Sequence, residues 1–176
     1  MKVRNMALCA LFAALLALCA WLSVPMGDSP ITLQTLGVAL ALWLLGGKRG
    51  MLAILVYLLL GAAGLPVFSG FRGGIGTLLG ATGGYLLGFL VWGGVYWLLH
   101  SCLPDSHKAR LMAMAAGLAA CYAFGSVWFY GMYLQGGSAA SLWLVIAKCV
   151  LPYLVPDGIK LAGAWFLAKR LRRFVY

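Results

Sequence analysis

The sequence predicts an all-α integral membrane protein with six transmembrane helices. Three observations support this fold class. First, 64% of the 176 residues are hydrophobic and only 9% are charged, whereas soluble domains average roughly 45–50% apolar and about 25% charged residues. Second, long apolar runs are separated by short breaks rich in glycine, proline and basic residues. Third, most basic residues cluster at alternate ends of successive runs.

The apolar runs define the expected helices in chain order. A helix needs about 20 apolar residues to cross a bilayer, with a range of about 17–25. Six runs approach or reach this length, at residues 6–24, 31–46, 51–65, 81–99, 109–130 and 157–174. The run at 139–151 is shorter and is followed by Pro152 and Pro156. It predicts a partial helix before the last span.

The first run follows Lys2 and Arg4, as a secretory signal peptide would. However, residues 6–24 exceed an ordinary signal-peptide core, and no small-residue cleavage site closes the run. We therefore expect a mature spanning helix.

The charges indicate the orientation of the spans. Ten of the 13 basic residues fall at ends that share one side of the predicted topology. The positive-inside rule makes that side cytoplasmic and places both termini in the cytosol. The formal charge of +10 therefore reflects membrane topology and not a nucleic-acid-binding surface. Three cations remain elsewhere and need another explanation: Arg72, Lys148 and Lys160.

Residues 64–89 hold nine of the 24 glycines, together with Arg72. Glycine inside a helix costs about 1 kcal/mol relative to alanine, so the cluster predicts irregular backbone. At membrane depth such backbone is tolerated only where it is buried in protein or lines a cavity. We expect a glycine-rich outer loop beside a ligand pocket.

Asp157 and Lys160 are three residues apart at the start of the last predicted span, so their side chains share a helix face. They could anchor a polar ligand. Alternatively they form a structural ion pair, with Asp157 as the N-terminal cap of that helix. Spacing does not separate these two interpretations.

Other candidates also have two interpretations. Arg72 could bind an anionic group such as a carboxylate, or be a solvated loop charge. Thr32, Gln34 and Thr35 could bind ligand or cap the second helix. Ala10 and Ala14 have the spacing of close helix packing, either inside the bundle or against another subunit.

Catalysis and metal binding have little support. The carboxylates are three aspartates without any glutamate, and both histidines fall on the side opposite Asp157. The five cysteines form no CxxC pair and suit apolar packing. We expect no enzyme activity, cofactor or metal, although an intramembrane enzyme and a structural or channel-like subunit remain alternatives to a binding protein.

Four segments together resemble the BioY family, the biotin-binding substrate components (S components) of energy-coupling-factor (ECF) transporters. They are residues 31–36 (ITLQTL), 64–68 (GLPVF), 81–86 (ATGGYL) and the Asp157-x-x-Lys160 pair. The resemblance covers nearly the whole chain. The family's usual proline is Ala81 here, and its usual Pro-Gly-Asp is Pro156-Asp157-Gly158.

The resemblance implies one transmembrane substrate-binding domain over residues 1–176, in the plasma membrane of a prokaryotic cell. It implies biotin as the transported ligand and, as partners, a transmembrane coupling subunit with two ATPase subunits. Facilitated biotin uptake by the chain alone remains an alternative. The implied biotin-binding residues are Thr82, Gly83, Gly84, Tyr85, Asp157 and Lys160, with Arg72 and Gln34 in addition. The implied contacts with the coupling subunit are Ala10 and Ala14.

Overall fold

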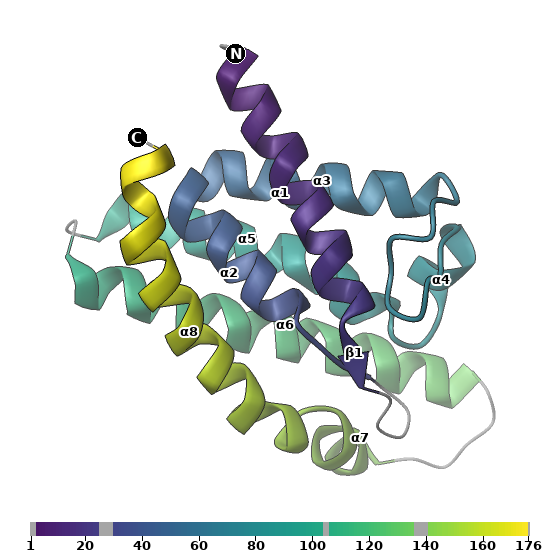
Figure 1. Cartoon of the computed structure of the whole chain (residues 1–176). Coiled ribbons are helices and arrows are strands. Elements are labelled where there is room, and N and C mark those ends of the chain that lie inside the picture. Colours follow the sequence, from purple (N-terminus) through teal and green to yellow (C-terminus); the bar gives the residue numbers. More distant parts are fainter. Residues whose placement is uncertain (1–2, 25–29, 104–105, 136–140, 176) are drawn as a thin grey trace.

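The computed structural model describes residues 3–24, 30–103, 106–135 and 141–175, and it confirms the all-α class. The helices are α1 (Val3–Trp21), α2 (Gln34–Leu45), α3 (Gly47–Ala62), α4 (Ile75–Leu79), α5 (Gly83–Cys102), α6 (His107–Gln135), α7 (Leu142–Cys149) and α8 (Leu151–Val175). Two short antiparallel strands, β1 (Ser23–Val24) and β2 (Ile31–Thr32), pair between α1 and α2. Figure 1 shows the helices gathered around α2.

Each of the six predicted runs forms a helix, but the count of six membrane spans stays a prediction. Within the described residues, α1, α5 and α6 are long and apolar enough to cross a membrane, and α7 with α8 would add a fourth span bent by 40°. The helices α2 and α3 have 12 and 16 residues. They are short because Gly46, at φ 79°, ends one and precedes the other.

The helix α2 lies at the centre of the fold. Nearly all of its residues are buried, and it packs against α1, α3 and α8. Its apolar side chains belong to a continuous core shared with most of the other helices. Because α2 is buried on all sides, its sequence is apolar around the whole helix and not amphipathic.

Glycines allow α5 and α6 to pack closely. A Cβ atom on Gly84 would lie 2.3 Å from Cβ of Trp128, and Gly125 faces the ring of Tyr85 in the same way. Our expectation of irregular backbone is therefore wrong at Gly83, Gly84 and Gly88, which lie within α5. Among the glycines of this stretch, Gly64, Gly70 and Gly74 have positive φ angles.

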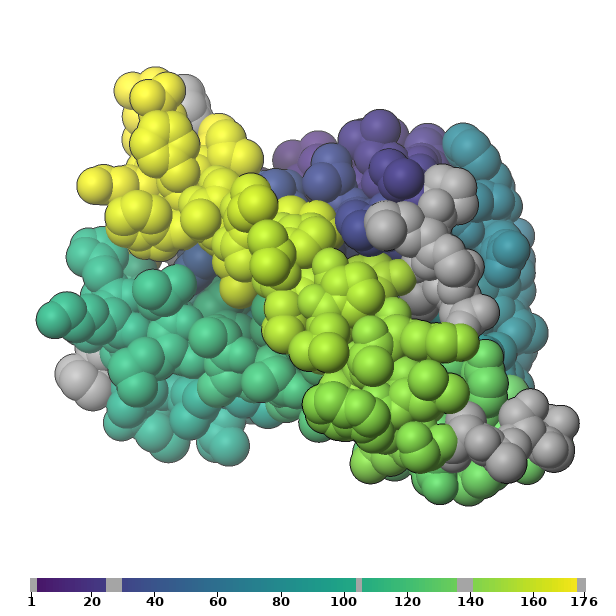
Figure 2. Space-filling model, turned by 90° about the horizontal axis from the view of Figure 1, so that it is seen from below, coloured from purple at the N-terminus to yellow at the C-terminus, as the bar shows by residue number. Residues whose placement is uncertain are grey.

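The last helix begins at Leu151, six residues before the predicted start. Pro152 lies in its first turn, where its missing N–H costs no helical hydrogen bond, and Pro156 lies inside it. Asp157 is consequently more than a turn inside α8, and its interpretation as an N-terminal cap is wrong. The short α7, which overlaps the predicted partial helix, precedes the bend into α8. Figure 2 shows α8 crossing one face of the molecule.

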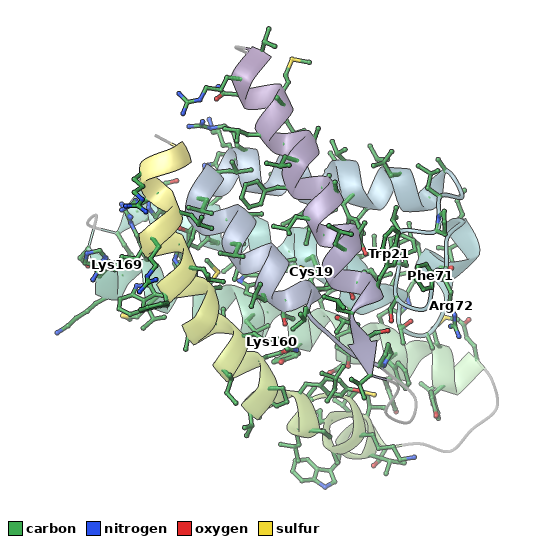
Figure 3. The ribbon with its side chains drawn as sticks, in the orientation of Figure 1. Cys19, Trp21, Phe71, Arg72, Lys160 and Lys169 are labelled. Atoms are coloured by element: carbon green, nitrogen blue, oxygen red, sulfur yellow. The ribbon has the colours of Figure 1, made fainter. Side chains whose placement is uncertain are left out.

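The basic groups meet at one end of the bundle, as the charge pattern predicts. Arg49 donates to Asn5 over 3.1 Å, and Lys48 lies 5.2 Å from the ring centroid of Trp97 near the end of α5. The start of α6 and the end of α8 bring Arg110 and Lys169 around one small cavity. Figure 3 shows Lys160 and Arg72 apart from Lys169.

Candidate functional site

A cavity of about 430 Å³ lies at the other end of the bundle, where α2, α5, α6 and α8 meet the glycine-rich loop. This volume falls in the range of about 300–1,000 Å³ that is typical of small-molecule sites. Its polar and charged lining residues include Thr32, Gln34, Thr35, Ser69, Arg72, Thr77, Thr82, Tyr85, Tyr122, Asp157 and Lys160. The cavity thus combines residues that are up to 137 positions apart in the sequence (Ser23 and Lys160).

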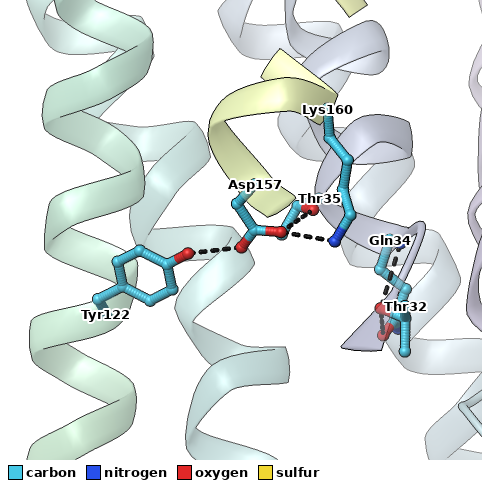
Figure 4. A network of polar contacts seen from close by, with 6 residues as sticks. All are labelled: Thr32, Gln34, Thr35, Tyr122, Asp157 and Lys160. Carbon is cyan, nitrogen blue, oxygen red and sulfur yellow. Dashed lines mark hydrogen bonds and ion pairs between the residues drawn. The ribbon is translucent and has the colours of Figure 1, made fainter. Parts of the chain in front are cut away.

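Asp157 is the centre of a buried polar network (Figure 4). Its Oδ1 accepts hydrogen bonds from Thr35 Oγ1 at 2.9 Å and from Lys160 Nζ at 2.6 Å. Its Oδ2 accepts one from the hydroxyl of Tyr122 at 2.5 Å. The Asp157 side chain is 4% exposed and that of Lys160 is 11% exposed. Three donors from three helices therefore compensate the cost of burying this carboxylate.

The network still has hydrogen-bonding capacity for a ligand. A carboxylate oxygen can accept about two hydrogen bonds, and an ammonium group can donate three. Among the described residues, Asp157 Oδ2 has one donor and Lys160 Nζ has one acceptor. An acceptor and a donor thus lie side by side at the cavity wall. The two interpretations of this pair are therefore compatible, because an ion pair also lines a cavity.

Gln34 is held by a second network. Its Nε2 donates to the hydroxyl of Tyr57 at 2.7 Å, and its Oε1 accepts from Thr32 Oγ1 at 2.9 Å. Thr32 Oγ1 also accepts from the backbone N–H of Gln34, so Thr32 supports the start of α2. Thr35 instead reaches Asp157, so helix capping does not explain it.

Part of the cavity wall is apolar. Phe68, Leu86, Phe89 and Leu118 line it, and all four side chains are at most 8% exposed. The ring of Phe68 also packs edge-on against Tyr57, with 5.5 Å between centroids. An apolar ring system could pack against this part of the wall.

The mouth is formed by the glycine-rich loop. Phe68 and Arg72 pair as an isolated antiparallel bridge, which folds the loop back on itself. At its tip Phe71 has a positive φ of 56° and stacks on Trp21, with 5.2 Å between ring centroids. Arg72 lines the cavity and is exposed, and its guanidinium has no hydrogen-bond or ion-pair partner among the described residues. This cation is available to a ligand that enters here.

The structure brings six of the eight predicted ligand-binding residues to the cavity, namely Gln34, Arg72, Thr82, Tyr85, Asp157 and Lys160. Gly83 and Gly84 are buried and do not line it. A Cβ on Gly83 would meet the backbone of Leu78. Both glycines shape the start of α5, and direct contact with ligand stays a prediction for them.

Sequence reasoning missed several lining residues, most notably Tyr122, Tyr153, Phe68 and Phe89. The signal for Tyr122 was a hydroxyl in the middle of an apolar run, which requires a buried partner. The phenylalanines gave no such signal. Among the described residues no group of three or more potential metal ligands occurs.

This fold, with an open cavity of small-molecule size and a buried ion pair at its wall, resembles that of membrane proteins that capture solutes. The structure matches the crystal structure of "the S-component for biotin from an ECF-type ABC transporter" with a TM-score of 0.84 and 26% identity, over 98% of this chain and 92% of that chain. The S component of a bacterial ECF transporter shares the fold at a TM-score of 0.66 and 12% identity, over 99% of both chains.

The chain belongs to the BioY family, whose model matches residues 1–176. It is 40% identical to the probable biotin transporter BioY of Pyrococcus horikoshii, over 98% of both chains. It is 39% identical to the biotin transporter BioY of Thermotoga maritima, over 97% of both chains. A biotin transporter BioY of Rhodobacter capsulatus is 36% identical, over 97% of this chain and 94% of that relative.

Proposed function

We propose that this chain is the biotin-binding S component of an ECF-type vitamin transporter and takes up biotin from outside a prokaryotic cell. Full-length similarity to biotin transporters and the match to a biotin S component support this function. The proposal includes a multi-pass location in the plasma membrane, with the cavity facing outward. The family is one of transporters, so the bound molecule is moved and not chemically changed.

One observation carries the choice of ligand: the same cavity is lined by a paired acceptor and donor, by apolar side chains and by a separate cation, Arg72. Biotin has a ureido ring, an apolar thiophane ring and a carboxylate, which match these three features. In our proposal Asp157 Oδ2 accepts a hydrogen bond from a ureido N–H, and Lys160 donates to the ureido oxygen. Arg72 then pairs with the carboxylate.

Active uptake requires energy from other subunits. The sequence contains no nucleotide-binding motif, so in this proposal ATP is hydrolysed by the ATPase subunits of an ECF module. Ala10 and Ala14 lie on the exposed side of α1, whereas Ala13 and Ala17 pack inward. This leaves the outer pair available for close contact with a coupling subunit.

Isothermal titration calorimetry of the detergent-purified chain tests the ligand, with riboflavin and thiamine as controls. Of these three vitamins, we expect only biotin to bind. Asp157→Asn and Lys160→Ala should each weaken binding by at least about tenfold, because hydrogen bonds to charged groups contribute about 1.5–3 kcal/mol. Lys148→Ala is the matched control, since Lys148 is exposed on α7 and does not line the cavity. Wild-type affinity in both cavity variants would disprove the proposed anchor.

A further inference from the structure

A second, smaller cavity lies at the end of the bundle opposite the larger cavity. It plays no part in the proposed binding of solute. Its volume is about 50 Å³, which is more than one water molecule needs. Its lining comes from α2 (Trp43), α6 (His107 and Arg110) and α8 (Trp165, Ala168, Lys169 and Arg172). Three helices that are distant in sequence therefore close around a space large enough for a small group.

The cavity concentrates positive charge. Arg110, Lys169 and Arg172 contribute three cationic groups from two helices, and His107 adds an imidazole. Two guanidinium groups and an ammonium group around a small space suit a phosphate, whose oxygens can pair with arginine in a bidentate manner.

Apolar side chains also line this cavity, next to the basic groups. Trp43 and Ala168 are buried, at 7% and 6% exposure. Trp165 is 42% exposed, and Lys169 Nζ lies 5.7 Å from its ring centroid. Tryptophan is enriched at the level of the lipid headgroups. The exposed Trp165 thus indicates that the cavity lies where the protein meets the membrane surface.

We propose that this cavity binds the phosphate group of an anionic membrane lipid and so ties the start of α6 to the end of α8. The charge pattern predicts that this end faces the cytosol, and basic pockets between helices on that side suit anionic headgroups. The lipid binds independently of the solute in the larger cavity. The group that occupies the cavity is small, because the volume of this cavity is about one eighth of that of the larger cavity.

A simpler explanation is that these basic residues only orient the protein in the membrane and stabilise the C-terminal end of α8. That explanation requires positive charge at this end of the molecule but no cavity. Any basic residue at this end would then contribute equally, which gives the two explanations different experimental outcomes.

The experiment measures thermal unfolding of the detergent-purified full chain by tryptophan fluorescence while phosphatidylglycerol is added. We expect stabilisation by about 3–5 °C at ten times the dissociation constant. Phosphatidylcholine and inorganic phosphate at the same concentrations should give no such shift. The double variant Arg110→Gln/Arg172→Gln should bind phosphatidylglycerol about 25-fold more weakly, at about fivefold for each charge removed.

The matched control is Lys48→Gln/Arg170→Gln. It removes the same charge at the same end, but neither residue lines the cavity, as Lys48 lies over Trp97 and Arg170 over Phe166. Its affinity for phosphatidylglycerol should stay within about twofold of wild type. A second variant, Ala168→Leu, keeps every charge and fills the cavity, so it should abolish the shift. Circular dichroism and gel filtration check that each variant is folded.

Equal weakening in both double variants would overturn the proposal in favour of general charge. A full shift in Ala168→Leu would show that lipid does not enter the cavity. Equal stabilisation by inorganic phosphate would make the ligand a free anion and not a lipid. A fourth result would assign the cavity to a protein partner. In that case phosphatidylglycerol would not shift the unfolding temperature of the wild type, and Arg110→Gln/Arg172→Gln would lose only its co-purification with other subunits.

Discussion

Asp157 is the residue on which the polar end of the larger cavity depends. Its two oxygens accept hydrogen bonds from Thr35, Lys160 and Tyr122, so three separate elements fix its position before any ligand arrives. A preorganised acceptor lowers the entropic cost of binding. Its neighbour Lys160 keeps donor capacity, which makes the pair suited to a ureido group that both donates and accepts.

The role of Arg72 can be tested by removing either partner of its proposed ion pair. Arg72→Gln should weaken biotin binding by about 5- to 30-fold, because a charged hydrogen bond is lost at an exposed site. The same substitution should change the affinity for biotin methyl ester by less than about twofold, since that ester has no carboxylate. Titration calorimetry measures both ligands. An equal loss for acid and ester would show that Arg72 does not contact the carboxylate.

Cysteine reactivity reports directly on occupation of the larger cavity. Cys121 and Cys149 line it, whereas Cys9 and Cys19 are buried elsewhere. Biotin should slow the reaction of Cys121 and Cys149 with a small methanethiosulfonate reagent at least about threefold, because the ligand would block access. Exposed Cys102 should react rapidly with or without biotin. Peptide mass spectrometry follows each site, and protection of Cys9 and Cys19 to the same degree would indicate general tightening instead.

At the scale of the elements, the pairing of α5 with α6 sets the shape of the cavity. Gly84 and Gly88 on α5 meet Trp128 and Cys121 on α6, while Gly125 on α6 receives the ring of Tyr85. Because Tyr85 lines the cavity, the same close packing positions a lining residue. The hydroxyl of Tyr85 lies 3.3 Å from Ser126 Oγ and links the two helices again.

This packing predicts different outcomes for two glycines on one helix. Gly84→Ala should lower the free energy of unfolding by about 1–3 kcal/mol, since its new Cβ would lie 2.3 Å from the Cβ of Trp128. Gly94→Ala has open space around it and should be neutral or stabilising by up to about 1 kcal/mol. Thermal unfolding in detergent compares the two variants. Equal stability of the two variants would mean that α5 and α6 can move apart with little loss of folding free energy.

At the scale of the whole molecule, the two ends of the bundle differ in composition. One end holds the larger cavity and the glycine-rich loop, and the other gathers the basic residues and the smaller cavity. The outer side of α1 extends between them, with Ala10 and Ala14 exposed next to Leu11 and Leu18. Small residues among larger apolar ones leave a shallow surface that another membrane helix could contact closely.

If a coupling subunit docks on this surface, large side chains introduced on it should weaken the docking. Ala10→Trp/Ala14→Trp should reduce co-purification with an ECF module at least tenfold, because large side chains prevent close approach of the helices. Biotin affinity of the isolated chain should not change. Val127→Trp, at an exposed position on α6, is the control and should co-purify normally. Normal co-purification of the α1 variant would place the coupling subunit on another face.

The sequence by itself determined the membrane class, the order of the helices and the distribution of charge, because each follows from hydropathy, breaks and basic residues along the chain. It also pointed to Asp157, Lys160 and Arg72, since charged residues in an apolar chain are few. Only the tertiary structure decided that Thr35 and Tyr122 complete the network of Asp157, that Gly84 serves helix packing, and that Arg110 and Arg172 share a cavity. These are contacts between residues far apart in sequence, and local propensity and spacing contain no information about which distant side chains meet.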